Sequence, residues 1–372
     1  MHRLYKGGAL LERLLGYPSP ADGDQPEAWF GAINAARPTV TSAVTEGLGR
    51  VVLPEDWRVG RKDSDNQITV LDLIDEEAEV ILGPAHVQLY GKSTAVLLKV
   101  LDSVERLTVQ VHPNQAFAQR YLGSRCGKDE AWVVLGVRED VAAHVVYYGL
   151  RESITSDQLS LWVGQGDITS LLDRMYQFQV DVGDVLYVPA GTIHAIGAGL
   201  LIAEVQEPTD FTFSFDREFG GRVLSDDRRF LGLNMSVALS AARLTSFSEL
   251  QIGHLWRVKA SSSRKATGPF HTQVTRPIGL NSNDRFWVEL ISVGPDDELV
   301  HPSAGSMSLG VATLGAGLLK GRNGRSLLIR QGDGFLIPAM LGEWSVESHG
   351  AGLQLVVCGP QSASIAASFL SR

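Results

Sequence analysis

Cysteine, basic clusters and long apolar runs are scarce in this sequence. Its 372 residues include two cysteines, Cys126 and Cys358, too few for a disulfide framework and not in zinc-finger spacing, so we interpret both as reduced packing residues. The formal net charge of −9 comes without a Lys/Arg block, which argues against nucleic-acid binding. No uncharged apolar run approaches the ~18 residues that span a bilayer, and residues 1–20 lack a signal-peptide layout. We therefore expect a soluble cytoplasmic protein without nucleic-acid or membrane partners.

Short apolar runs between turn residues dominate what is present. Glycine occurs 39 times and proline 15 times, and they separate runs rich in Val, Leu, Phe and Tyr. These runs are AVLLKVL, LTVQVHP, AWVVLGV, AAHVVYYG, DVLYVPA, LLIAEVQ and FTFSFD, which have the texture of strands. Helical spacing is confined to 8–16, 156–175 and 224–243, the last with Ser225 or Asp226 as N-cap. The pattern predicts a mainly β chain, a barrel or a sandwich, with a few short helices.

One octapeptide occurs twice in similar form. GDVLYVPA at 183–190 and GDGFLIPA at 332–339 share Gly-Asp at the start and Pro-Ala at the end. Gly-Asp makes a tight turn into a strand, and Pro ends the strand at a sheet edge. The alternative to two barrels of one kind is a chance likeness of two hairpins. The pattern G-D-x-x-x-[VI]-P resembles the second motif of the cupin superfamily, which implies tandem cupin-like β-barrels (jelly rolls) in domains 1–245 and 246–372.

The two copies differ in the residues that follow them. His194 follows the first copy, whereas Glu343 stands at the corresponding position after the second. His301 precedes Pro302 and has no His-x-His partner. We therefore expect the C-terminal barrel to be structural or a lid, without a metal.

Gln110 and His112 are the first candidate metal ligands. They lie two apart in LTVQVHP, so on a strand their side chains share one face, while Val109 and Val111 face apolar packing on the other. Pro113 then ends the strand. A polar pair on one face suits the inside of a barrel that holds a ligand.

Glu130 and His194 complete the candidate set. Glu130 stands at the entrance of the strand in GKDEAWVVL, and His194 follows the strand and turn of GDVLYVPA. Each residue alone could be an ordinary core or surface residue. Together they give two imidazoles, a carboxylate and an amide oxygen, which suit Zn²⁺ and also Fe²⁺, Mn²⁺ or Co²⁺. Catalytic sites of this kind leave a position open for substrate oxygens.

These segments resemble the type I phosphomannose isomerases, most closely the short bacterial forms. The family patterns Q-x-H-P, K-x-E and P-x-G-x-x-H-A occur in the family's order at 110–113, 128–130 and 189–195. The resemblance covers 85–216 well and 1–35 loosely. It implies one Zn²⁺ per chain on Gln110, His112, Glu130 and His194, and interconversion of mannose 6-phosphate and fructose 6-phosphate.

The resemblance also implies residues that contact a small sugar-phosphate substrate. It assigns substrate binding to Lys99, Thr108 and Glu27, the last in an E-x-W-x-G motif. It assigns pocket positions to Lys128, Glu204 and Asp210. We expect Glu204 to perform the acid–base work, assisted by Lys128 and Asp210.

Two departures from the family pattern bear on the substrate, and a third lies near the N-terminus. The arginine that the family has four residues after Asp210 is Ser214 here, and Arg217 replaces it only if a bulge or turn intervenes. Ile33 or Asn34 stands where relatives often have a histidine, and Lys6-Gly7-Gly8 replaces a Trp-Gly near the N-terminus. Two alternatives stay open: an isomerase of another sugar or phosphosugar, and a catalytically silent sugar-phosphate-binding cupin. A monomer and a homodimer are both compatible with the sequence.

Overall fold

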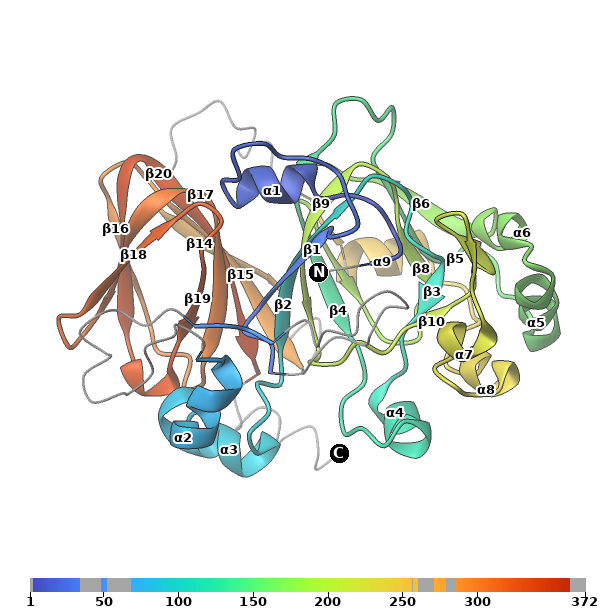
Figure 1. Cartoon of the computed structure of the whole chain (residues 1–372), viewed down its shortest axis with the longest axis horizontal. Helices are drawn as coiled ribbons and strands as arrows, with labels where there is room; N and C mark the ends of the chain where they lie inside the picture. Colours follow the sequence, from blue (N-terminus) through green and yellow to red (C-terminus); the bar gives the residue numbers. More distant parts are fainter. Residues whose placement is uncertain are drawn as a thin grey trace. The chain divides into compact units, whose positions relative to one another are not determined.

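The computed structural model describes residues 3–33, 48–51, 68–255, 257–259, 271–278 and 285–361 (Figure 1). The chain is mainly β, with antiparallel sheets and short helices, as the sequence predicts. It divides into two compact units. The first comprises Met1–Arg13, Pro18–Glu27 and Val100–Arg264, and the second Leu14–Tyr17, Ala28–Lys99 and Lys265–Arg372. These units are interleaved along the chain, and the division at 245 stays a prediction. Among the described residues, no helix is both long and apolar enough to cross a membrane.

Two sheets have most of their strands in the first unit. One has the strand order β1-β2-β9-β4-β7-β13 and the other β10-β3-β8-β5-β6 (Figure 1). The strands of the first sheet are β1 (Glu27–Phe30), β2 (Leu97–Ser103), β4 (Glu130–Val137), β7 (Val185–Val188), β9 (Leu200–Gln206) and β13 (Arg257–Val258). Those of the second are β3 (Gln110–Val111), β5 (Val145–Leu150), β6 (Met175–Gln179), β8 (His194–Ile196) and β10 (Phe213–Ser214). A small hairpin joins β11 (Glu218–Phe219) to β12 (Arg222–Val223).

Both sheets of the first unit contribute side chains to one apolar core. Trp132 and Ile202 come from the first sheet, and Val146, Tyr148 and Ile196 come from the second. All are buried. This core fills one part of the space between the sheets, and strand alternation leaves other inward positions for polar groups.

A second core lies on the other face of the β3–β8–β5 sheet. Val109 and Val111 pack there with residues from short helices, which confirms the predicted alternation along LTVQVHP. These helices are α5 (Ser156–Gln165), α6 (Ile168–Leu172) and α8 (Met235–Leu239). The helices expected within 156–175 and 224–243 are therefore confirmed, and Ser225 caps α7 (Asp226–Arg229) as predicted. The helix expected over 8–16 is α1 (Ala9–Leu14).

The second unit contains one sheet with the order β14-β15-β20-β17-β18, with β16 paired to β20 and β19 to β17. The strands are β14 (Gln273–Ile278), β15 (Phe286–Val293), β16 (Glu298–His301), β17 (Ser308–Gly321), β18 (Ser326–Arg330), β19 (Gly334–Ile337) and β20 (Trp344–Pro360). Helices α2 (Val70–Leu82) and α3 (Pro84–Tyr90) belong to this unit, as does the 3₁₀ turn at Ala339–Leu341. The sequence analysis missed α2 and α3, and also α4 (Gln115–Tyr121) and α9 (Glu249–Leu255) of the first unit.

The repeated octapeptide makes the same turn in both units. Gly183 and Gly332 have φ of 91° and 90°, a region that favours glycine. Gly183 N–H donates to Val134 at 2.8 Å, and Val134 N–H donates back to the Asp184 carbonyl at 2.9 Å. In the second unit, Gly332 and Asp333 make the same two bonds with Ala312, at 2.8 and 2.9 Å. The likeness of the two segments is therefore structural as well as sequential.

Candidate metal centre

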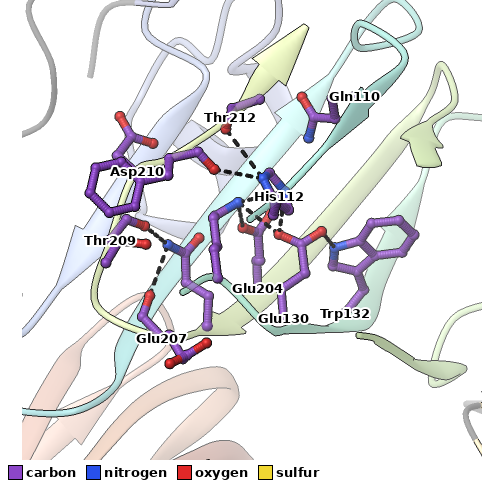
Figure 2. Close-up of polar contacts among 12 residues, drawn as sticks. Gln110, His112, Glu130, Trp132, Glu204, Glu207, Thr209, Asp210 and Thr212 are labelled. Carbon is purple, nitrogen blue, oxygen red and sulfur yellow. Dashed lines mark hydrogen bonds and ion pairs between the residues drawn. The ribbon is translucent and has the colours of Figure 1, made fainter. Parts of the chain in front are cut away.

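Among the residues that the structure describes, one group of three side chains could hold a metal ion. It consists of His112, Glu130 and His194, which are all buried and offer ligand atoms within 4.8 Å of one another. His112 Nε2 lies 3.0 Å from Glu130 Oε2, and His194 Nε2 lies 3.2 Å from Glu130 Oε1. Figure 2 shows His112 and Glu130 meeting between the strands. These sequence-predicted residues thus come together from β4, from β8 and from the position that follows β3.

Strand geometry explains this convergence. Gln110 pairs with His194 across β3 and β8, and Glu130 is the first residue of β4 in the opposing sheet. Gln110 Nε2 lies 3.2 Å from His194 Nε2, so the fourth predicted ligand adjoins the cluster. The amide oxygen and nitrogen of glutamine are assigned from their surroundings, and a half-turn of the amide presents the oxygen instead.

Backbone carbonyls orient both imidazoles. His112 Nδ1 lies 2.8 Å from the carbonyl oxygen of Phe211, and His194 Nδ1 lies 2.8 Å from that of Thr192. A carbonyl only accepts, so each Nδ1 carries the proton and donates it. Burial and the nearby Lys128 ammonium lower the pKa of His112 to about 3, so this ring is neutral at pH 7. Its Nε2 lone pair therefore faces Glu130, which is the orientation of a metal-bound histidine.

The centre of the cluster requires positive charge. A neutral Nε2 and a carboxylate oxygen at 3.0 Å are both acceptors, and Lys128 Nζ satisfies them at 2.9 and 2.7 Å. Burial alone would raise the pKa of Glu130, but Lys128 and then the two imidazoles hold it well below its usual range. Trp132 Nε1 donates to the other carboxylate oxygen at 3.1 Å. Two imidazoles, an ionised carboxylate and an amide fit a divalent transition metal.

Partly exposed residues adjoin the buried cluster on one side. The Thr108 hydroxyl donates to Gln110 Oε1 at 3.3 Å, and Ser214 pairs with Gln110 across β10 and β3. Asp210 lies near His112 in Figure 2 and is also partly exposed. Glu204 is buried, with Oε1 3.4 Å from Lys128 Nζ, so it belongs to the same constellation.

The remaining predicted substrate residues have different surroundings. Lys99 is buried on β2. Both carboxylate oxygens of Glu27 are engaged, by Tyr5 Oη and by Arg3 Nη2, each at 2.7 Å. Arg217 is exposed and lies beside Gly166 at the end of α5. Their substrate roles stay predictions.

The histidine that relatives often have corresponds to Ile33 or Asn34 in this sequence. Ile33 is partly buried, and Asn34 lies outside the described residues.

Sequence reasoning missed two neighbours of the cluster. Trp132 lies two residues after Glu130 on β4, so the alternation used for Gln110 and His112 could have placed it on the same face. Arg3 pairs with Glu27 at 2.7 Å and with Asp210 at 3.3 Å. Nothing in the local sequence around Arg3 indicates this, because its partners lie far along the chain.

The second unit has a different residue at the position that corresponds to Glu130 of the first unit. Glu130 pairs with Val188 of the first octapeptide copy, and Ser308 pairs with Ile337, the matching residue of the second copy. A serine therefore replaces the carboxylate. His301 of this unit is buried, 2.6 Å from Glu289 through Nε2, and its ring stacks on Trp344.

Comparisons with known proteins agree on one family. The mannose-6-phosphate isomerase of Bacillus subtilis is 36% identical over 134 residues, which are 35% of this chain and 40% of that protein. The mannose-6-phosphate isomerase of Streptococcus mutans is 32% identical over 225 residues, 59% of this chain and 60% of that protein. The alignments thus span about half the length of these relatives. No family model matches the chain.

A solved structure extends the likeness to the fold of the whole chain. The crystal structure of the mannose 6-phosphate isomerase from Bacillus subtilis superposes with a TM-score of 0.69 and 21% identity, over 96% of both chains. At this identity the superposition concerns the fold alone. By sequence over part of its length, and by fold over nearly all of it, the chain is similar to mannose-6-phosphate isomerases.

Proposed function

We propose that the chain is a metal-dependent aldose–ketose isomerase that interconverts mannose 6-phosphate and fructose 6-phosphate. The observation that carries this proposal is the buried cluster of His112, Glu130 and His194, with Glu204 close by, in a chain related to mannose-6-phosphate isomerases. The names of the relatives supply the substrate pair. The side chains supply groups that the reaction requires.

The reaction moves a proton between C1 and C2 of the sugar through an enediol. We assign one Zn²⁺ per chain to Gln110, His112, Glu130 and His194, although Fe²⁺, Mn²⁺ and Co²⁺ accept the same donors. When bound there, the metal supplies the Lewis acidity that polarises a substrate oxygen. The Nδ1 bonds to backbone carbonyls keep both imidazoles turned inward for this purpose.

Glu204 is the proposed acid–base residue. Its carboxylate is buried and lies 3.4 Å from Lys128, which in turn lies 2.7 Å from Glu130. Lys128 can therefore orient the Glu204 carboxylate toward a substrate beside the metal ligands. Glu204 would take the proton from one carbon and return it to the other, and Asp210 would assist from the partly exposed side.

Binding of the substrate's phosphate group requires hydrogen-bond donors and positive charge. We propose the Thr108 hydroxyl, which is partly exposed beside Gln110, and the Lys99 ammonium that the family pattern assigns to the active site. A phosphorylated sugar substrate favours a cytoplasmic location. The repeated Gly-Asp turns support the assignment of both barrels to the cupin type.

The test is formation of fructose 6-phosphate from mannose 6-phosphate by the purified protein. We expect activity that a chelator removes and that added Zn²⁺ restores. Metal analysis of the purified protein should find a bound transition metal. No product from metal-replete protein would overturn the isomerase assignment, and a negligible metal content after expression in metal-rich medium would overturn the metal site.

A catalytically silent sugar-phosphate-binding cupin is the second candidate. Ser214 favours it, because its buried Oγ has no hydrogen-bond partner within the described residues, and the family pattern has an arginine at this position. An isomerase of another sugar or phosphosugar is the third candidate. If the serine limits catalysis, Ser214→Arg should raise turnover of mannose 6-phosphate. Binding of mannose 6-phosphate without turnover, in wild type and variant alike, would favour the silent cupin.

A further inference from the structure

Arg3 joins two carboxylates close to the candidate metal centre. Its Nη2 lies 2.7 Å from Glu27 Oε2, and its Nη1 lies 3.3 Å from Asp210 Oδ2. The Arg3 side chain is 14% exposed and that of Glu27 4% exposed. Burial alone would lower the pKa of Arg3, but Asp210 and Glu27 raise it, so the guanidinium is charged at any working pH. This is a bridge of one buried cation between two anions.

Glu27 is held firmly enough to anchor the bridge. Its second carboxylate oxygen accepts a hydrogen bond from Tyr5 at 2.7 Å, and Tyr5 belongs to the core of the first unit. Arg3 N–H also donates to the carbonyl of Asp24 at 2.8 Å. Arg3 therefore presents its guanidinium from a fixed segment, and Asp210 is the partner whose position it can determine.

Asp210 lies in the loop that orients a candidate ligand. The loop connects β9 to β10, and its first part is tied down where Thr209 Oγ1 donates to the Gly127 carbonyl at 2.6 Å. The next residue after Asp210 is Phe211, whose carbonyl oxygen accepts the bond from His112 Nδ1 at 2.8 Å. Figure 2 shows Asp210 beside this contact. A shift of Asp210 would move the peptide that fixes the His112 ring.

We infer that Arg3 is a positioning residue for the metal centre, acting through Asp210 and the Phe211 carbonyl on the orientation of His112. The inference rests on the proposed metal site. Histidine ligands depend on the acceptor at their other ring nitrogen, and loss of such a partner typically weakens metal binding by about 10–100-fold. Arg3 acts one step beyond that partner, so removing it should raise the Kd for Zn²⁺ about tenfold, at the lower end of that range.

A matched control exists in the same unit. Arg138 also bridges two carboxylates, Asp22 at 2.7 Å and Asp102 at 2.8 Å, and its side chain is 12% exposed. It follows the end of β4, a whole strand away from Glu130 at the start. Arg138→Met therefore breaks a comparable ion-pair cluster without touching the loop at Asp210.

The experiment measures the Kd for Zn²⁺ by competition with a chromophoric chelator, in wild type, Arg3→Met, Arg3→Lys and Arg138→Met. We expect about a tenfold rise for Arg3→Met and no rise for Arg138→Met. A lysine keeps one charge but not the planar fork, so Arg3→Lys should lie between wild type and Arg3→Met. The absorption spectrum of bound Co²⁺ should change in Arg3→Met, because it reports ligand geometry.

Each outcome has one meaning. An unchanged Kd and Co²⁺ spectrum in Arg3→Met would overturn this inference alone, as would equal losses in Arg3→Met and Arg138→Met. Absence of metal binding by the wild type would overturn the proposed function and this inference with it. If Arg3→Met does not fold, Asp210→Asn leaves the Arg3–Glu27 pair intact and should show the same rise in Kd, and an unchanged Kd there would count equally against the inference.

Discussion

Replacement of Glu130 by glutamine separates the contribution of this carboxylate to folding from its contribution to metal binding. In the structure the carboxylate contacts Lys128 at 2.7 Å and Trp132 at 3.1 Å, with both imidazoles within 3.2 Å. Removing one partner of a buried ion pair costs about 3–5 kcal/mol. Glutamine can still accept the Trp132 bond, and Glu204 still lies 3.4 Å from Lys128. We therefore expect the lower value, about 3 kcal/mol, for the chelator-treated protein.

The second part of this prediction concerns the metal. A ligand at 100 times its Kd stabilises the folded state by about 2.7 kcal/mol. Wild type should gain about this much in free energy of unfolding on adding Zn²⁺ at that excess. The Glu130→Gln variant lacks the charged ligand, so at the same Zn²⁺ concentration its gain should be small. Urea unfolding followed by circular dichroism, with chelator and with Zn²⁺, measures both quantities.

Glu207→Gln is the control for this experiment. Glu207 is also a buried glutamate, and its carboxylate accepts N–H bonds from Gly127 at 3.2 Å and Asp129 at 3.0 Å. Its loss should destabilise the fold but leave the gain from Zn²⁺ unchanged. If Glu130→Gln gained as much from Zn²⁺ as the wild type does, Glu130 would not be a metal ligand.

Three further predictions follow from other contacts. Lys128→Met removes a positive charge from beside the candidate ligands. The Kd for Zn²⁺ should therefore fall about tenfold or more, although isomerase turnover also falls. Weaker zinc binding by the variant in a chelator competition would contradict this prediction. Burial alone would raise the pKa of Glu289, but His301 and Arg276 lower it below its usual range. The ionised carboxylate therefore stabilises the fold at neutral pH, and the stabilisation is lost as the pH falls through the lowered pKa. Glu289→Gln should therefore flatten the pH dependence of the free energy of unfolding below about pH 5, and an unchanged slope would refute the assignment. Burial raises the pKa of the Cys358 thiol, whereas Cys126 is partly exposed. A thiol reagent should therefore label one cysteine in the native protein and two after unfolding. Rapid labelling of both cysteines in the native state would show that Cys358 is not buried.

The meeting of the candidate ligands could be predicted because its signals are local. The two-residue spacing of Gln110 and His112 sets their common face, and the structure brings both to the cluster. Glu130 and Lys128 are likewise two apart, and they meet at 2.7 Å. Short-range spacing on strands is a reliable guide to which side chains share a face.

Other parts depended on contacts that no local pattern reveals. Arg3 and Asp210 are 207 residues apart, and the pair forms only because the N-terminal segment lies beside the β9–β10 loop. Helix α4 had a local signal that the sequence analysis did not use. Asn114, directly after the strand-ending Pro113, caps this helix by accepting a bond from Phe117 N–H at 2.9 Å. Helix α2 likewise begins with a capping box formed by Thr69 and Asp72, a second local signal that the sequence analysis did not use.

The two Gly-Asp turns also bear on how such a chain can diverge in evolution. In both turns main-chain groups of glycine and aspartate bond to the neighbouring strand. The aspartate carboxylate also accepts an N–H bond from the residue three positions earlier, Asp181 in the first turn at 3.3 Å and Arg330 in the second at 2.8 Å. A unit with such a turn could gain or lose a carboxylate at the position of Glu130 or Ser308 by a point substitution, with the turn unchanged. Chemistry and architecture can then be selected separately. The two units accordingly share the octapeptide turn and differ at the position that pairs with it, glutamate in one and serine in the other.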